Sequence, residues 1–173
     1  MMKWVAFLRG INVGGHRKVP MADLRKICVD VLGARDVRTY IASGNVVFAA
    51  AGTAHDLAVS LQEGIAAALG FDVPVLVLNA DAMRAVLESC PFPHDSGKAV
   101  HAFLCYDTPR IDDSVVDKFR APTEQLVTVG RTVWLYAPEG IGRSKLAEKL
   151  DVGVEVTARN LNTIQKMVDM LDA

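Results

Sequence analysis

The sequence predicts an α+β protein made of two tandem ferredoxin-like halves packed together, with a linking helix and a C-terminal helix. Three observations favour this fold class. Strand and helix patterns follow the order β-α-β-β-α-β in residues 1–78, the order recurs in residues 98–173, and residues 79–97 between them read as one helix and a loop. A chain of 173 residues suits one domain or two small ones, and a hydrophobic content of 51% excludes a disordered chain.

The first half begins with a short apolar run that predicts a buried strand. Apolar residues then recur at helical spacing after Pro20 and stop at Gly33, residues that suit the start and end of a helix. Two segments rich in β-branched and aromatic residues flank Ser43-Gly44-Asn45, which is typical of a hairpin. Strands are expected at residues 3–8, 37–41, 45–49 and 73–78, and helices at 21–32 and 54–69, the second capped by Thr53.

The second half follows a linking helix that is capped by Asn79 and a loop that runs from Pro91 to Gly97. Its elements are shorter, and the pattern predicts Thr157 as the N-cap of the last helix. Strands are expected at residues 99–106, 124–129, 132–137 and 154–156, and helices at 112–119, 143–150 and 158–171.

Composition excludes several classes of protein. No apolar run approaches the roughly 18 residues of a transmembrane helix, and the apolar stretch near the start is too short for a secretory signal, so we expect a cytoplasmic protein without membrane contact. Three cysteines without a C-x-x-C pair predict buried thiols. No cofactor motif or metal-ligand set is present, and we expect neither.

The net charge of −1 hides an uneven distribution, because basic residues outnumber acidic ones in residues 1–50 and the reverse holds in 51–140. The first half contains a glycine-bearing basic loop, residues 9–18. Such a loop can turn backbone amides towards an anion held by basic side chains. The alternative is that its glycines serve only to permit positive φ angles. It is not a nucleotide-binding P-loop, since His16 and Arg17 stand where Lys and Ser or Thr are required.

Two later segments, 140–145 and 157–163, each open a predicted helix with basic residues. A cation there opposes the helix dipole, so it needs a carboxylate partner or a bound anion, unless the long side chain simply extends into water. The predicted partner is a small anionic ligand or a nucleic acid, and the oligomeric state stays open. The predicted ligand-binding residues are Arg9, Gly10, Asn12, Gly14, Gly15, Lys18, Ser43, Asn45, Arg143, Lys145, Arg159 and Asn160.

Two other functions stay open. One is an enzyme with a site between the halves, in which His16 or Ser43 takes part, although Ser43 lacks the first glycine of a G-x-S-x-G motif. The other is a protein-interaction scaffold that uses Trp134 and Tyr136, which share a strand face. The same two rings could stack on RNA bases, but the RNA-recognition signature is absent from the third strand, where only Phe48 is aromatic.

Four blocks carry a specific resemblance to a known family: Leu8 to Gly15, the segment from Met21 to Arg25, Thr39 to Phe48, and Thr157 to Thr163. They resemble the bacterial family called domain of unknown function 1697, over essentially the whole chain. The resemblance implies a compact α+β protein related to ferredoxin-like folds, with no established activity, cofactor or catalytic residue. One departure is Leu161, where the family usually has Trp. If that Trp ring stacks on a ligand, the contact is missing in this chain; if it is a core residue, Leu replaces it there.

Overall fold

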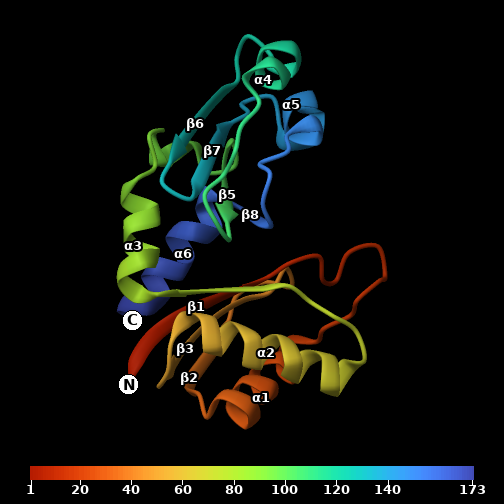
Figure 1. The fold of residues 1–173 in the computed structure, drawn as a ribbon. Coiled ribbons are helices and arrows are strands. Elements are labelled where there is room, and N and C mark those ends of the chain that lie inside the picture. Colours follow the sequence, from red (N-terminus) through yellow and green to blue (C-terminus); the bar gives the residue numbers. More distant parts are fainter. The chain divides into compact units, whose positions relative to one another are not determined.

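The computed structural model describes residues 1–173, and it is a mixed α+β protein with two four-stranded antiparallel sheets and six α-helices (Figure 1). The chain divides into two compact units. Unit 1 consists of Met1–Arg84 together with Met167–Ala173, and unit 2 consists of Ala85–Lys166. No helix is both long and apolar enough to cross a lipid bilayer.

The sheet of unit 1 has the order β2-β3-β1-β4, and each neighbouring pair of strands is antiparallel. Helices α1 and α2 lie side by side on one face of it (Figure 1). Trp4, Leu24 and Leu61 are buried between this face and the helices, as their apolar spacing predicts. The elements are β1 (Met2–Leu8), α1 (Met21–Leu32), β2 (Arg35–Thr39), β3 (Asn45–Ala50), α2 (Ala54–Leu69) and β4 (Val75–Asn79).

Both helices begin and end where the sequence predicts. Gly33 and Gly70 end α1 and α2 in the left-handed conformation, with φ of 61° and 84°, which glycine adopts without a Cβ clash. The Thr53 side chain accepts a hydrogen bond from the Asp56 amide and caps α2. Local sequence chemistry therefore fixes the helices of unit 1.

Two further helices contribute to both units, because α3 (Ala80–Glu88) and α6 (Leu161–Asp172) each contain a unit boundary. The last turns of α6 are tied to the first sheet. Lys3 Nζ donates to the Leu171 carbonyl at 2.8 Å, and Arg38 donates to the Met170 carbonyl at 2.7 Å. Arg84 in α3 forms an ion pair of 2.6 Å with Asp172. The end of the chain is thus an integral part of unit 1.

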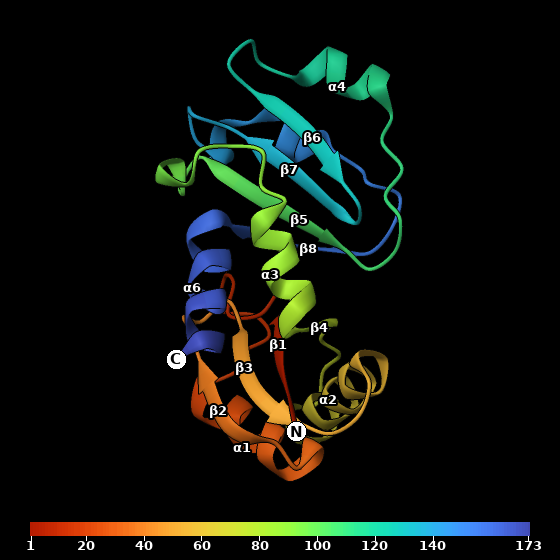
Figure 2. The same ribbon diagram turned by 90° about the vertical axis from the view of Figure 1, so that its left-hand side faces the viewer.

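The sheet of unit 2 has the order β6-β7-β5-β8, again antiparallel throughout. Figure 2 shows the four strands in this order, and helices α4 and α5 cover one face of the sheet (Figure 1), where Phe103, Leu126 and Leu135 pack against them. The elements are the single turn η1 (His94–Ser96), β5 (Val100–Cys105), α4 (Asp113–Phe119), β6 (Gln125–Val129), β7 (Thr132–Tyr136), the single turn η2 (Ile141–Arg143), α5 (Lys145–Lys149) and β8 (Val156–Asn160).

The predicted boundary between the last strand and the last helix is wrong. Residues 156–160 pair with β5, so Thr157 lies in β8 and its hydroxyl lies 3.2 Å from the Tyr106 hydroxyl. The cap of α6 is Asn160, whose Oδ1 accepts from the Thr163 amide at 2.9 Å. Pairing across five residues of β5 outweighs the local capping preference of Thr157. The predicted helix 143–150 is likewise shorter, because Arg143 belongs to η2 and Ser144 caps α5.

Leu161 is only 1% exposed. In this chain the position is therefore filled by a core residue, and leucine there serves packing.

Candidate functional site

The basic loop after β1 is held in one conformation by the side chain of Asn12. Its Nδ2 donates to the carbonyls of Val19 at 2.9 Å and Ala42 at 2.7 Å, and its Oδ1 accepts from the Val19 amide at 2.8 Å. The Asn12 backbone N–H also donates to the Arg17 carbonyl at 3.1 Å. Asn12 therefore closes the loop on itself and ties it to the β2–β3 connection, so its amide group positions the loop.

The β2–β3 connection packs against the base of this loop. The Leu8 amide donates to the Gly44 carbonyl at 2.9 Å, and a Cβ added at Gly44 would lie 2.8 Å from side-chain atoms of Leu8 and Ile11. Asn45 is fully buried, and its Nδ2 donates to the Tyr40 carbonyl and to Ser43 Oγ, both at 2.9 Å. The fold thus brings residues 9–18 and 40–45 together into one surface, which we call the loop surface.

Three non-glycine residues of the loop surface have left-handed backbone conformations. The φ angle is 55° at Asn12, 50° at Arg17 and 50° at Ile41. A β-branched residue in this region is strained by about 1–3 kcal/mol, and such strain gathers at functional sites. Ile41 is 52% exposed and Val13 is 67% exposed, so the strain at Ile41 is not explained by burial of its side chain.

The loop surface is locally basic. Arg9, His16, Arg17 and Lys18 are all exposed, and residues 9–18 and 40–45 contain no Asp or Glu. None of these four side chains forms an ion pair with a carboxylate. The positive charge of the loop is therefore uncompensated and open to solvent.

The second basic segment lies in unit 2. Arg143 and Lys145 are exposed on either side of buried Ser144, whose Oγ is occupied in accepting the Ala147 amide at 3.0 Å. Together with Glu124 and Glu139 they line a hollow of 280 Å³. The sequence did not indicate Glu124 as a site residue, because it stands there as the first residue of the expected strand 124–129.

The basic side chain of the third segment, Arg159, lies in a strand and not at the start of a helix. Arg159 lies in β8 opposite Ala102, and burial lowers the pKa of its guanidinium to about 10, while the nearby Tyr106 raises it. The side-chain oxygen of Asn160 accepts the hydrogen bond that caps α6. These two residues stabilise the end of β8 and the start of α6.

The residues of the enzyme hypothesis are exposed. Ser43 Oγ accepts from Asn45, and the His16 amide donates to the Val13 carbonyl at 3.0 Å. Neither residue lines any of the four hollows described in the structure. No geometry among these contacts singles out a catalytic pair.

The shared strand face of Trp134 and Tyr136 is not an open stacking platform. Trp134 is fully buried, and its Nε1 donates to Ser89 Oγ at 3.3 Å. Tyr136 is half-buried and stacks on Phe92 with ring centroids 5.5 Å apart. Trp134 is thus a core residue that reaches neither a base nor a partner protein.

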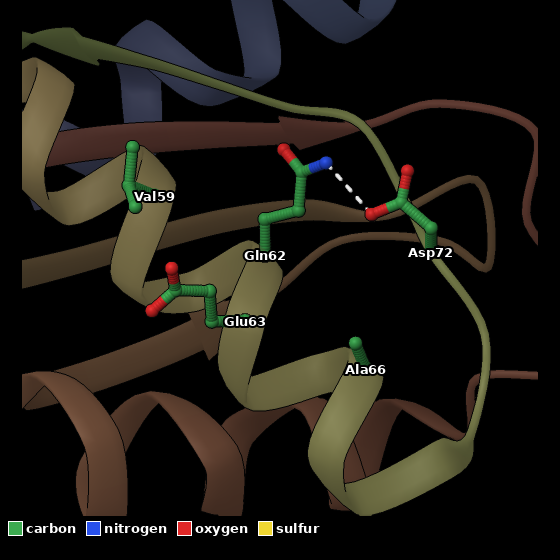
Figure 3. Close-up of a pocket in the computed structure, with 5 residues that line it drawn as sticks. All are labelled: Val59, Gln62, Glu63, Ala66 and Asp72. Carbon is green, nitrogen blue, oxygen red and sulfur yellow. Dashed lines mark hydrogen bonds between the residues drawn. The ribbon is translucent and has the colours of Figure 1, made fainter.

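Another hollow, of 300 Å³, lies along the outer side of α2 (Figure 3). Gln62 and Asp72 are joined across it by a hydrogen bond of 2.8 Å, and Glu63 lies beside them (Figure 3). Its ionisable groups are both carboxylates and it contains no predicted site residue, so its electrostatics disfavour an anion.

Two buried ionisable groups lie away from these surfaces. His101 on β5 is 8% exposed, and its Nε2 is fully enclosed without a hydrogen-bond partner. Burial lowers the pKa of His101, while a hydrogen bond with the Lys98 backbone raises it. Burial raises the pKa of the Cys28 thiol to about 12, which makes it a packing group.

Comparison with known proteins places the chain in a family. The family described as "Protein of unknown function (DUF1697)" matches residues 1–134, so the chain belongs to it and the resemblance seen in the sequence is confirmed. The match includes the loop surface and ends before the block at 157–163. The structure of conserved bacterial protein SP0830 from Streptococcus pneumoniae is similar, with 28% identity, 98% of each chain covered and a TM-score of 0.73. No curated protein matches the chain.

Proposed function

We propose that the loop surface of unit 1 binds a phosphate- or carboxylate-bearing partner, such as a nucleotide or a nucleic acid. The observation that carries the proposal is the set of three side-chain hydrogen bonds of Asn12, which holds the loop in place while its cations stay exposed. A loop that is already ordered loses less conformational entropy on binding. The uncompensated charge of Arg9, Arg17 and Lys18 then favours an anion.

The expected contribution of each cation is modest. An exposed ion pair contributes about 0.2–1 kcal/mol, and a factor of ten in affinity corresponds to about 1.4 kcal/mol. Removing Arg17 and Lys18 together should therefore weaken binding by about tenfold.

The test measures binding of ATP and of a short fluorescent oligonucleotide by thermal shift and fluorescence anisotropy. The R17A/K18A double variant should bind about tenfold more weakly. The matched control, K98A/K149A, removes the same charge from exposed positions of unit 2 and should bind like the native protein. Absence of binding by every anion, or equal losses in both double variants, would refute the proposal.

Salt dependence separates the two kinds of partner. A nucleic acid releases condensed counterions when its phosphates are neutralised, so its affinity should fall steeply between low and physiological salt. The affinity of a mononucleotide should change much less over the same range.

The N12A variant distinguishes a positioning role of Asn12 from direct contact with the ligand. N12A keeps every cation of the loop but removes the three hydrogen bonds that fix it. Weaker binding in N12A with an unchanged dependence on salt would support a positioning role for Asn12.

We also propose that each unit has a ferredoxin-like fold. The proposal is supported by the order β-α-β-β-α-β along each unit and by the sheet orders β2-β3-β1-β4 and β6-β7-β5-β8, in which the first and third strands of each set are central.

A further inference from the structure

The hollow between residues 119–124 and 139–145 of unit 2 carries charges of both signs, and we call it the mixed-charge hollow. Its ionisable lining residues are Glu124, Glu139, Arg143 and Lys145. Its volume of 280 Å³ lies just below the roughly 300–1,000 Å³ of pockets for drug-sized ligands, so only a small molecule fits.

Glu124 is the buried charge of this hollow. It is 4% exposed, and its Oε1 accepts from the Ala121 amide at 2.9 Å. The neighbouring Arg120 donates to the Glu124 backbone carbonyl at 2.8 Å, not to its carboxylate, and Glu124 forms no ion pair. A buried carboxylate without a cationic partner is costly, which is a reason to expect a partner from outside the chain.

The second carboxylate oxygen of Glu124 is not enclosed by the protein. Among fully enclosed side-chain nitrogen and oxygen atoms, the one without a hydrogen-bond partner is His101 Nε2. Glu124 Oε2 also has no hydrogen bond within the protein, so it is not fully enclosed and reaches accessible space. Glu124 is itself one of the residues that line the mixed-charge hollow.

The positive charges stand at the rim. Arg143 and Lys145 are exposed, and neither forms an ion pair with Glu124, Glu139 or any other carboxylate. The hollow therefore presents one buried carboxylate, that of Glu124, while its exposed lining side chains are the cations Arg143 and Lys145 and the carboxylate Glu139, which leaves an excess of positive charge on the exposed side. A molecule with only one sign of charge would meet repulsion at one end or the other.

We propose that the mixed-charge hollow binds a free α-amino acid, with its ammonium group at Glu124 and its carboxylate at Arg143 and Lys145. An ammonium group supplies up to three hydrogen-bond donors to a carboxylate, and an arginine guanidinium can hold a carboxylate through two parallel hydrogen bonds. Phe119 supplies an apolar wall for a side chain.

The experiment is a ¹H–¹⁵N NMR titration of the full chain with a panel of free L-amino acids at millimolar concentration. At least one of them should shift the amides of residues 121–124 and 140–145. Methylammonium and acetate, which each carry one of the two charges, should bind more weakly than that amino acid.

Three variants make the result specific. E124Q removes the charge but keeps an oxygen that can accept the Ala121 amide, so the turn should be retained, and binding should weaken by about tenfold or more. R143Q changes an exposed residue and should weaken binding by about fivefold. E63Q, in the hollow along α2, should leave binding unchanged.

Two results would overturn the proposal. One is that no amino acid shifts the amides of the mixed-charge hollow. The other is that E124Q, folded as judged by its NMR spectrum, binds as tightly as the native protein.

Discussion

His101 should make unit 2 sensitive to acid, and replacing it with leucine should remove that sensitivity. The imidazole is 8% exposed and its enclosed Nε2 has no hydrogen-bond partner. Leaving a buried polar group unsatisfied costs about 1–3 kcal/mol. H101L removes this unsatisfied group. It also removes the hydrogen bond with the Lys98 backbone, whose loss costs about 0.5–1.5 kcal/mol. At pH 8 we therefore expect H101L to be as stable as the native protein, or more stable by about 1–2 kcal/mol.

The pH dependence follows from the lowered pKa of His101. Because burial disfavours the charged imidazole, the unfolded chain takes up the proton first as the pH falls. The stability contributed by neutral His101 is complete above about pH 6.5 and is lost as the pH falls from there through the folded-state pKa. Between the unfolded-state and folded-state pKa values the difference in stability changes by at most about 1.4 kcal/mol for each pH unit, so the advantage of H101L should grow between pH 8 and pH 5.

The assay is urea unfolding at both pH values, followed by tryptophan fluorescence in a W4F background, so that the signal comes from Trp134, which is buried in unit 2. Other titrating groups contribute equally to both proteins and cancel in the difference. H94Q changes an exposed histidine of the same unit and should show no pH-dependent difference from the native protein. The reasoning fails if the difference between H101L and the native protein is the same at pH 8 and pH 5.

Three further predictions concern packing, capping and thiol reactivity. G44A places a methyl group 2.8 Å from Leu8 Cβ at a φ of 91°, and should lower the free energy of unfolding by about 1–3 kcal/mol or more in chemical denaturation. N160A removes the cap of α6 and should cost about 1 kcal/mol by the same measurement. Cys28 should resist a disulfide reagent until the protein unfolds, because burial raises its pKa to about 12, whereas half-buried Cys90 should react first in a timed thiol assay.

The helices of unit 1 could be predicted because their signals are local, whereas the strand expected at 37–41 was wrong in its bounds, since β2 is Arg35–Thr39 and Ile41 has a left-handed φ of 50°. The helix from Met21 to Leu32 has an apolar stripe and ends at Gly33, and both features act within a few residues of each other. The end of β8 could not be predicted in this way. Thr157 resembles a helix cap in its own neighbourhood, and only the antiparallel partner β5, far away in the sequence, keeps residues 156–160 extended.

The candidate sites also contain features that the sequence predicts and features that it does not. The exposed cations and glycines of residues 9–18 are visible in the sequence, and so is the charge of Arg143 and Lys145. What the sequence hides is which polar side chains are already occupied. The amide of Asn12 reads as a ligand contact, yet its hydrogen bonds go to the chain itself, so it can act on a ligand only through the loop.

Glu124 shows the opposite case. In the sequence it is one acid among 20 acidic residues, but the structure buries it to 4% exposure, with one oxygen bonded to a backbone amide and no ion pair to its carboxylate. Burial of an unpaired charge is a property of three-dimensional packing, and no spacing rule in the sequence reports it. The two candidate sites therefore rest on different physics: the loop surface on exposed charge held by a satisfied amide, and the mixed-charge hollow on a buried charge that the protein leaves unpaired.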